Sequence, residues 1–275
     1  MSLTFKEEGH LYESSDPTEK IDWLSVTSLV SKFKQPFDAE KQAKKSSKNP
    51  RSKWHGIPPE ELIGIWNGES KRATDLGTWY HNQREADLMQ FETIERKGKE
   101  VPIIAPIIQN EVKYAPKQLL RDAVYPEHFV FLKSAGICGQ ADYVEVVDNV
   151  VDIMDYKTNK EIKTKAFTNW EGITQMMEAP LSHLEDCHIS HYALQMSIYL
   201  YMILKHNRDL KPGTLTINHI VFHKMGDDQY GNPITLMGDN GNPVVKEIVP
   251  YELPYLKQEV ISLINWRHEN KKDAS

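Results

Sequence analysis

Three charged residues, Asp142, Asp155 and Lys157, have the types and the spacing for metal-assisted chemistry. Asp142 closes the motif GQAD, and the other two belong to DYK; both motifs lie in stretches typical of β-strands. If the two strands pair so that the aspartates face each other, their Cβ atoms lie about 4.5–5.5 Å apart. Two buried like charges repel, and a divalent cation between them would turn that repulsion into a binding site. Two acids and an amine at one strand end are suited to metal-assisted attack on a phosphodiester.

The strands that would position these groups are residues 140–147 and 150–157, both rich in β-branched and aromatic side chains. Between them, Asp148 and Asn149 tolerate the left-handed backbone of a tight turn. This turn sets the two aspartates opposite each other and, because side chains alternate along a strand, directs the lysine to the same face. A four-residue loop would keep this register, whereas a three-residue loop would break it. The alternative interpretation of the whole segment is an ordinary surface hairpin with polar ends.

The composition of the chain is that of a soluble globular protein, with 40% hydrophobic and 26% charged residues among 275. The longest apolar run, within residues 192–204, is too short to span a bilayer. The N-terminus lacks the basic and apolar segments of a signal peptide. Cys138 and Cys187 are too few for a disulfide framework or a four-cysteine cluster. We therefore expect one cytoplasmic domain over residues 1–275, with no membrane contact.

Charge is distributed unevenly along the chain. Residues 32–53 contain eight basic and two acidic residues, whereas the rest of the chain contains 25 basic and 37 acidic residues. Such a local excess is typical of a surface that follows a phosphate backbone, and it is equally compatible with a solvated loop. The candidate DNA contacts in this stretch are Lys41, Lys44, Lys45, Arg51 and Lys53.

Around these residues, the pattern predicts mainly helices first and strands later. Residues 3–12 predict a strand with Phe5, His10 and Tyr12, and Ser25 to Ser28 offer caps for a short helix that ends near Phe33. The later predictions are a loop or partly helical segment over 34–58, helices over 59–67 and 70–95, broken or short helices over 100–122 (with Pro102, Pro106 and Pro116), a strand over 124–132, one or two helices over 161–180, a buried helix over 190–205, a strand over 214–224, turns over 226–243 and a helix over 254–270.

This order predicts an α/β fold, an α+β mixed sheet flanked by helices, in a single domain. Residues 1–122 form a mostly helical N-terminal part with a basic loop at 32–53. Residues 123–224 form the core that carries the acidic motifs, and residues 225–275 form a turn-rich segment with a closing helix.

The order of the motifs resembles that of the PD-(D/E)XK nuclease superfamily. GTWYH is followed by PEHFVF, GQAD, DIMDYKT and HYALQMSIY, and the resemblance covers roughly residues 5–222. It is to the RecB-like branch, which includes phage exonucleases and the mitochondrial genome maintenance exonuclease. The resemblance implies a restriction-endonuclease-like core and a divalent-metal-dependent DNA exonuclease with little sequence specificity, used in phage-type DNA processing or recombination in the host cytoplasm.

The resemblance also assigns residues to roles. It implies a catalytic set composed of Asp142, Asp155, Lys157, Glu85 and Glu127. It implies three metal ligands, namely His81, Asp142 and Asp155. It implies DNA contact and active-site support from the QxxxY motif, Gln195 and Tyr199. Taken singly, these residues have plainer interpretations: an exposed helical pair for His81 and Glu85, a satisfied buried amide for Gln195, and core packing for Tyr199.

The implied cofactor is Mg²⁺ or Mn²⁺, and an imidazole ligand favours Mn²⁺. Some relatives carry an iron–sulfur cluster on four cysteines, and with two cysteines no such cluster is expected here. The implied partner is DNA, as single strands or duplex ends, and a recombination or replication protein is a further candidate. The alternatives are a structure-specific or restriction-type endonuclease, a catalytically inactive DNA-binding protein with the nuclease fold, and a hydrolase of small phosphoesters.

Overall fold

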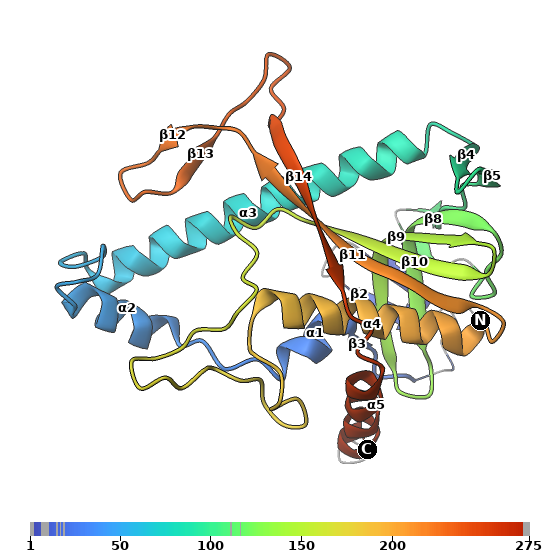
Figure 1. Ribbon diagram of the computed structural model, residues 1–275, viewed down its shortest axis with the longest axis horizontal. Coiled ribbons are helices and arrows are strands. Elements are labelled where there is room, and N and C mark those ends of the chain that lie inside the picture. Colours follow the sequence, from blue (N-terminus) through green and yellow to red (C-terminus); the bar gives the residue numbers. More distant parts are fainter. Residues whose placement is uncertain are drawn as a thin grey trace.

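The computed structural model describes residues 3–6, 11–14, 16, 18, 20–110, 112–115 and 117–271. His10 and Pro116, which belong to two of the predicted segments, lie outside these residues. The described chain forms a mixed α/β fold with a central sheet and a long helix, α3 (Pro59–Leu88), that runs across much of the molecule (Figure 1). Within the described residues, no helix is long and apolar enough to cross a bilayer.

The central sheet is mixed, as the sequence predicts. Its neighbours β10 and β11 are parallel, as are β3 and β9, and the other pairs are antiparallel. In spatial order the strands are β14 (Val245–Leu253), β11 (Lys211–Phe222), β10 (Val150–Lys157), β9 (Ile137–Val147) and β3 (Leu24–Ser25), and β8 (Ala123–Leu132) also pairs with β9. Strand β14 was not predicted from the sequence.

The predicted register of the β9–β10 hairpin is confirmed. Val147 pairs with Val150 and Val144 with Ile153. The two turn residues between the strands have φ angles of 55° and 61°, the left-handed conformation that an Asp-Asn turn tolerates. The hairpin therefore directs alternate side chains to two different faces of the sheet.

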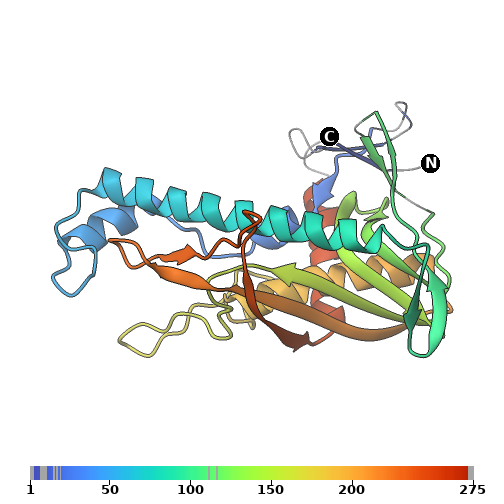
Figure 2. The same ribbon diagram turned by 90° about the horizontal axis from the view of Figure 1, so that it is seen from above.

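These two faces have different neighbours (Figure 2). One face carries Val144 and Ile153 and packs against α1 (Val26–Ser31), α4 (His188–His206) and α5 (Lys257–Lys271) in the main core. The buried helix predicted over 190–205 and the closing helix are thus confirmed as α4 and α5. The opposite face, with Tyr143 and Met154, packs against Leu88 at the end of α3 and against the hairpin of β4 (Thr93–Arg96) and β5 (Lys99–Pro102).

Two helical predictions in the first half of the chain were wrong in extent. The helices predicted over 59–67 and 70–95 are one helix, α3, which ends at Leu88. Gly68 does not interrupt it, because a single exposed glycine costs a helix only about 1 kcal/mol. The basic stretch, predicted to be a loop or partly helical, is partly helical, because it contains helix α2 (Ala39–Lys48). The side chain of Asp38 caps α2 by accepting a hydrogen bond from the Lys41 N–H at 2.9 Å.

Strands are found where short helices were predicted after α3. The segment over 100–122 contains β5, β6 (Ile107–Gln109) and β7 (Val112–Tyr114) where short helices were predicted. With β1 (Leu3–Lys6) and β2 (Leu11–Ser14), strands β6 and β7 form a small separate sheet. The N-terminal part is therefore less helical than predicted. The turn-rich segment over 226–243 does contain a short hairpin, β12 (Lys224–Asp227) with β13 (Pro233–Thr235).

The helix predicted over 161–180 is absent from the described structure, which has turns and isolated bridges there. Long-range hydrogen bonds hold this segment instead. The Gln35 amide donates to the Met176 carbonyl at 3.0 Å, and the Gln175 side chain donates to Asp186 at 2.8 Å. Such partners, distant in the sequence, outweigh a local helical preference.

Candidate metal centre

Three side chains from three elements converge beside the end of the β9–β10 hairpin. His81 of α3, Glu127 of β8 and Asp142 of β9 each offer a ligand atom, and these atoms lie within 4.8 Å of one another. His81 Nδ1 is 3.2 Å from Asp142 Oδ2 and 4.0 Å from Glu127 Oε1. All three side chains are largely shielded from solvent. Two carboxylates and an imidazole at such distances form a candidate site for a divalent cation.

Glu127 owes its place to an irregularity in β8. Pro126 pairs with Tyr143 and His128 with Ala141, so Glu127 lies across from Asp142 at the point where the ladder is interrupted. Its φ angle is 49°, in the left-handed region that residues other than glycine rarely adopt. The side chain also accepts a hydrogen bond from the Gln140 amide. Strained backbone of this kind is concentrated at functional sites.

The backbone fixes the orientation of His81. Its Nε2 lies 3.2 Å from the carbonyl oxygen of Tyr156. A carbonyl only accepts hydrogen bonds, so Nε2 must carry the proton and donate it. In the neutral ring, Nδ1 then presents a lone pair toward the Glu127 and Asp142 carboxylates. Three electron-pair donors that face one another require a cation among them, either a proton or a metal ion.

Asp155 and Lys157 lie beside this cluster but form a pair of their own. Asp155 is only 2% exposed and makes an ion pair with the Lys157 ammonium. The group of converging ligand atoms contains two of the predicted ligands, His81 and Asp142, together with Glu127. Asp155 is not in that group, and its role as a ligand stays a prediction. Burial opposes the charge of Lys157, but the Asp155 and Asp142 carboxylates outweigh burial and raise its pKa. The lysine therefore remains an ammonium.

The carboxyl groups of the cluster resist ionisation in the metal-free protein. Burial, with the charges of Asp142 and Glu85, raises the pKa of Glu127 to about 9. Burial and the charge of Asp155 raise the pKa of Asp142 to about 6, although His81 and Lys157 act in the opposite direction. The protein thus supplies too little positive charge to neutralise its own acids here. Hard oxygen ligands with one imidazole fit Mn²⁺ or Mg²⁺, the cations implied by the sequence.

The cluster opens into a cavity of about 750 Å³. Its lining includes Glu85, Gln195 and Tyr199, three residues singled out by the sequence. Gln195 donates a hydrogen bond to the Tyr199 hydroxyl at 3.2 Å, and burial raises the pKa of that hydroxyl well above its usual range. A Cβ atom on Gly139 would lie 2.6 Å from the Tyr199 ring. The glycine of the GQAD motif therefore lets α4 approach the strand at the site.

Two residues of the cavity escaped the sequence-based assignment. Gln140 lies inside the GQAD motif, and its hydrogen bond to Glu127 could have been suspected from that position. Lys113 of β7 also lines the cavity. Its charge lowers the pKa of Glu127, whereas burial and the neighbouring acids raise it. No sequence signal marks Lys113, because its small sheet is brought to the site by tertiary contacts.

The predicted DNA contacts of the basic stretch lie outside this cavity. They are exposed on α2 and the turn after it, beside the first half of α3 (Figure 1). His81 is 22 residues along α3 from Pro59, a rise of about 33 Å along the helix axis. The basic surface and the acidic cluster are therefore separate regions joined by α3.

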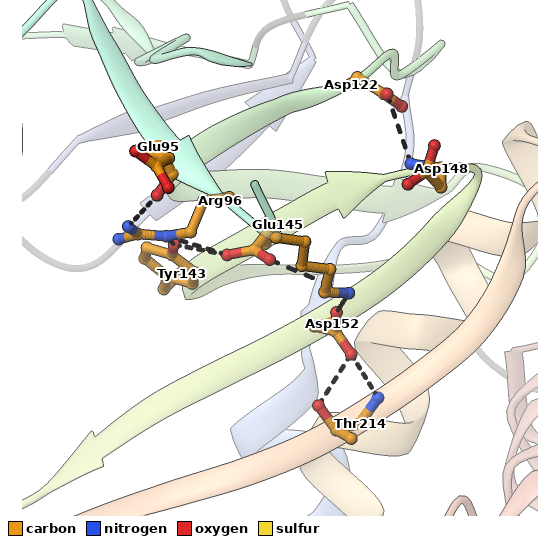
Figure 3. A network of polar contacts seen from close by, with 9 residues as sticks. Glu95, Arg96, Asp122, Tyr143, Glu145, Asp148, Asp152 and Thr214 are labelled. Carbon is orange, nitrogen blue, oxygen red and sulfur yellow. Dashed lines mark hydrogen bonds and ion pairs between the residues drawn. The ribbon is translucent and has the colours of Figure 1, made fainter. Parts of the chain in front are cut away.

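A second acidic pair lies on the other face of the same hairpin (Figure 3). Glu145 and Asp152 are directly paired across the strands. Arg96 Nε lies 3.1 Å from Glu145, and Lys97 Nζ lies 2.5 Å from Asp152. The Tyr143 hydroxyl donates to Glu145 at 2.9 Å. This network fastens the β4–β5 hairpin to the sheet and gives each of the two acids a cationic partner.

Comparisons with known proteins add little to this geometry. No protein-family model matches the chain, and no curated protein sequence matches it. Among solved structures, SSO0001 is similar over 92% of this chain and 78% of its own, with 13% sequence identity and a TM-score of 0.32. A likeness at this TM-score supports no conclusion about the chain.

Proposed function

We propose that this protein is a divalent-metal-dependent deoxyribonuclease with a PD-(D/E)XK type of site, acting as an exonuclease with little sequence specificity. The observation that supports this most is the convergence of His81, Glu127 and Asp142 beside the Asp155–Lys157 ion pair, at the end of one hairpin. The order of the sequence motifs supports it independently.

We assign a different role to each group of residues in the site. His81, Glu127 and Asp142 hold the cation, and Asp155 positions Lys157. When bound, a divalent cation lowers the pKa of water and stabilises negative charge on phosphate oxygens. Lys157 lines the same cavity as a permanent ammonium, where it offsets the charge that develops on the phosphate during attack. Gln195 and Tyr199 border the cavity from α4 and support the substrate backbone.

The basic surface favours a polymeric substrate over a small phosphoester. Its five basic residues are all exposed: Lys41, Lys44, Lys45, Arg51 and Lys53. Within the described chain, an acid pairs with Lys44, whose Nζ lies 3.5 Å from Glu40. Lys53 also donates a hydrogen bond to the Tyr230 carbonyl at 2.9 Å. A basic surface remote from the reacting centre can contribute to binding only if the ligand is long enough to reach both regions. Phosphate contacts of this kind give affinity without sequence preference.

Digestion of end-labelled single-stranded and duplex oligonucleotides with Mg²⁺ or Mn²⁺ tests this function. We expect cleavage that EDTA stops and fresh metal restores, and that Lys157→Ala and Asp155→Ala abolish. Lys71→Ala is the matched control, since Lys71 is an exposed lysine of α3 paired with Asp75. Closed circular DNA remains intact with an exonuclease and is nicked by an endonuclease. Full activity of Lys157→Ala in metal-replete buffer would count against the proposal.

A further inference from the structure

The loop between β10 and α4 presents apolar side chains to solvent at its tip. Phe167 is 72% exposed, Trp170 91% and Ile173 62%. The exposure of Trp170 shows that this side chain is not part of the core. Three large apolar side chains at one exposed turn are unusual on a protein surface that has no binding task.

The tip is an ordered turn that holds these side chains in place. Asn169 Oδ1 accepts hydrogen bonds from the N–H groups of Glu171 and Ile173, both at 2.9 Å. The Gln175 N–H donates to the Phe167 carbonyl at 2.9 Å, and the hydroxyls of Thr168 and Thr174 lie 2.9 Å apart. Little backbone freedom remains to be lost at the tip when a ligand binds there.

Hydrogen bonds join the loop that carries the tip to the segment just before helix α2. Asp186, at the end of the loop, accepts from the Gln35 N–H at 2.8 Å, and the Gln35 amide donates to Glu178 at 2.8 Å. Three residues after Gln35, Asp38 caps α2. Figures 1 and 2 both show α2 and the loop extending toward the same end of the molecule.

The charge around the tip indicates what it meets. Lys163 and Lys165 are exposed on the limb of the loop that leads to the tip, where Lys163 lies 3.9 Å from Glu161. Glu171 is the exposed acid at the tip itself. In the described chain no acidic side chain pairs with Lys41, Lys45 or Lys48 of α2. Cations beside exposed aromatic rings suit a polyanion that also offers flat apolar faces. A single-stranded nucleic acid does so, whereas a duplex keeps its base faces stacked inside.

We propose that Trp170, with Phe167, stacks on unpaired bases of single-stranded DNA whose phosphates lie against α2. This inference rests on the proposed nuclease function and specifies its substrate as a single strand or a single-stranded end.

Binding of a fluorescently labelled single strand and of its duplex, measured in EDTA to prevent cleavage, tests this assignment. We expect Trp170→Ala to weaken single-strand binding by about five- to a hundredfold, the usual range for one lost stack, and to leave duplex binding unchanged. Trp170→Phe should restore most of the affinity. Phe91→Ala is the control, since Phe91 is 60% exposed at the other end of α3. On an oligonucleotide without bases, the effect of Trp170→Ala should disappear.

Several outcomes would overturn the assignment. These are unchanged single-strand binding by Trp170→Ala, an equal loss on the duplex or with Phe91→Ala, and an effect that persists without bases. Reduced self-association with unchanged DNA binding would assign the tip to a protein contact. Because binding is measured without metal, it is independent of the cleavage assay. Cleavage of DNA with no contribution from Trp170 would refute this inference and leave the nuclease proposal standing.

Discussion

The β9–β10 hairpin carries two pairs of acids with different surroundings. Glu145 and Asp152 are directly paired on the face covered by the β4–β5 hairpin. The ladder ends at Tyr143 and Met154, and Asp142 and Asp155 are the next residue on each strand, on the other face. The difference between a structural network and a candidate active site must therefore come from what surrounds them.

What differs is the supply of cations. Arg96 and Lys97 neutralise the first pair (Figure 3). Burial opposes ionisation of Asp152, but hydrogen bonds from Lys97 and Thr214 outweigh it and lower its pKa. The second pair receives one ammonium, Lys157, while Glu127 adds a further acid. A buried acidic cluster without matching protein cations indicates a place for an external one.

The largest expected effect is on cleavage. Asp142→Asn removes one charged ligand and should reduce the rate at least about a hundredfold, because loss of a single electrostatic contact to the transition state commonly costs that much. Glu145→Gln makes the same chemical change in the other pair and should leave the rate of the folded protein within a few-fold of wild type. Initial rates on a labelled single strand measure both, and equal losses would break the comparison.

The next effect is on the pH dependence of stability. Glu127 has a pKa of about 9 in the folded protein, well above that of an unfolded glutamate, so the folded state retains a proton that the unfolded chain has lost. Stability of the metal-free protein should therefore be greatest below about pH 4.5 as far as this group is concerned, and should fall as pH rises toward 9. Denaturant unfolding in EDTA at several pH values measures it. Glu127→Gln should flatten the slope, whereas Glu145→Gln should not.

How far the sequence predicts this arrangement depends on the range of the forces involved. The hairpin register follows from alternating β-branched residues and the Asp148-Asn149 turn, which are local. The irregular loop at 161–180 was missed because Gln35, far away in the sequence, holds it. The position of the Glu127 side chain depends on a left-handed backbone conformation, which no local sequence pattern predicts. Its convergence with His81 and Asp142 therefore became visible only with the fold, as did the pairing of Asp155 with Lys157.

Opposite signs of stability change should also separate the pairs. In EDTA near pH 8, Asp142→Asn should raise the free energy of unfolding, because it removes a buried charge that repels its neighbours. Arg96→Met should lower it by about 1–3 kcal/mol, because Glu145 then loses its guanidinium partner and keeps only the hydrogen bond from Tyr143 and the more distant Lys97. Urea denaturation measures both changes. Destabilisation by both substitutions would mean that the site is already neutralised from within.

The smallest expected effects concern two glycines, one beside each pair. A Cβ atom on Gly139 would meet the Tyr199 ring at 2.6 Å, and one on Gly213 would meet the Val151 carbonyl at 2.8 Å and also Asp152. Each alanine substitution should destabilise the fold by about 1–3 kcal/mol through overpacking. Gly139→Ala should also reduce cleavage, because Tyr199 borders the cavity. Gly213→Ala should leave cleavage unchanged at temperatures where the protein remains folded, and a loss there would contradict the separation of the two regions.

The most direct test of the central claim is calorimetric titration of Mn²⁺ into the metal-free protein near pH 8. If the unneutralised cluster is the cation site, wild type and Glu145→Gln bind Mn²⁺ alike, and Asp142→Asn binds at least about tenfold more weakly. Binding should release protons, since Glu127 must ionise as the metal enters. Equal affinity of Asp142→Asn and wild type, or no binding by either, would contradict the claim.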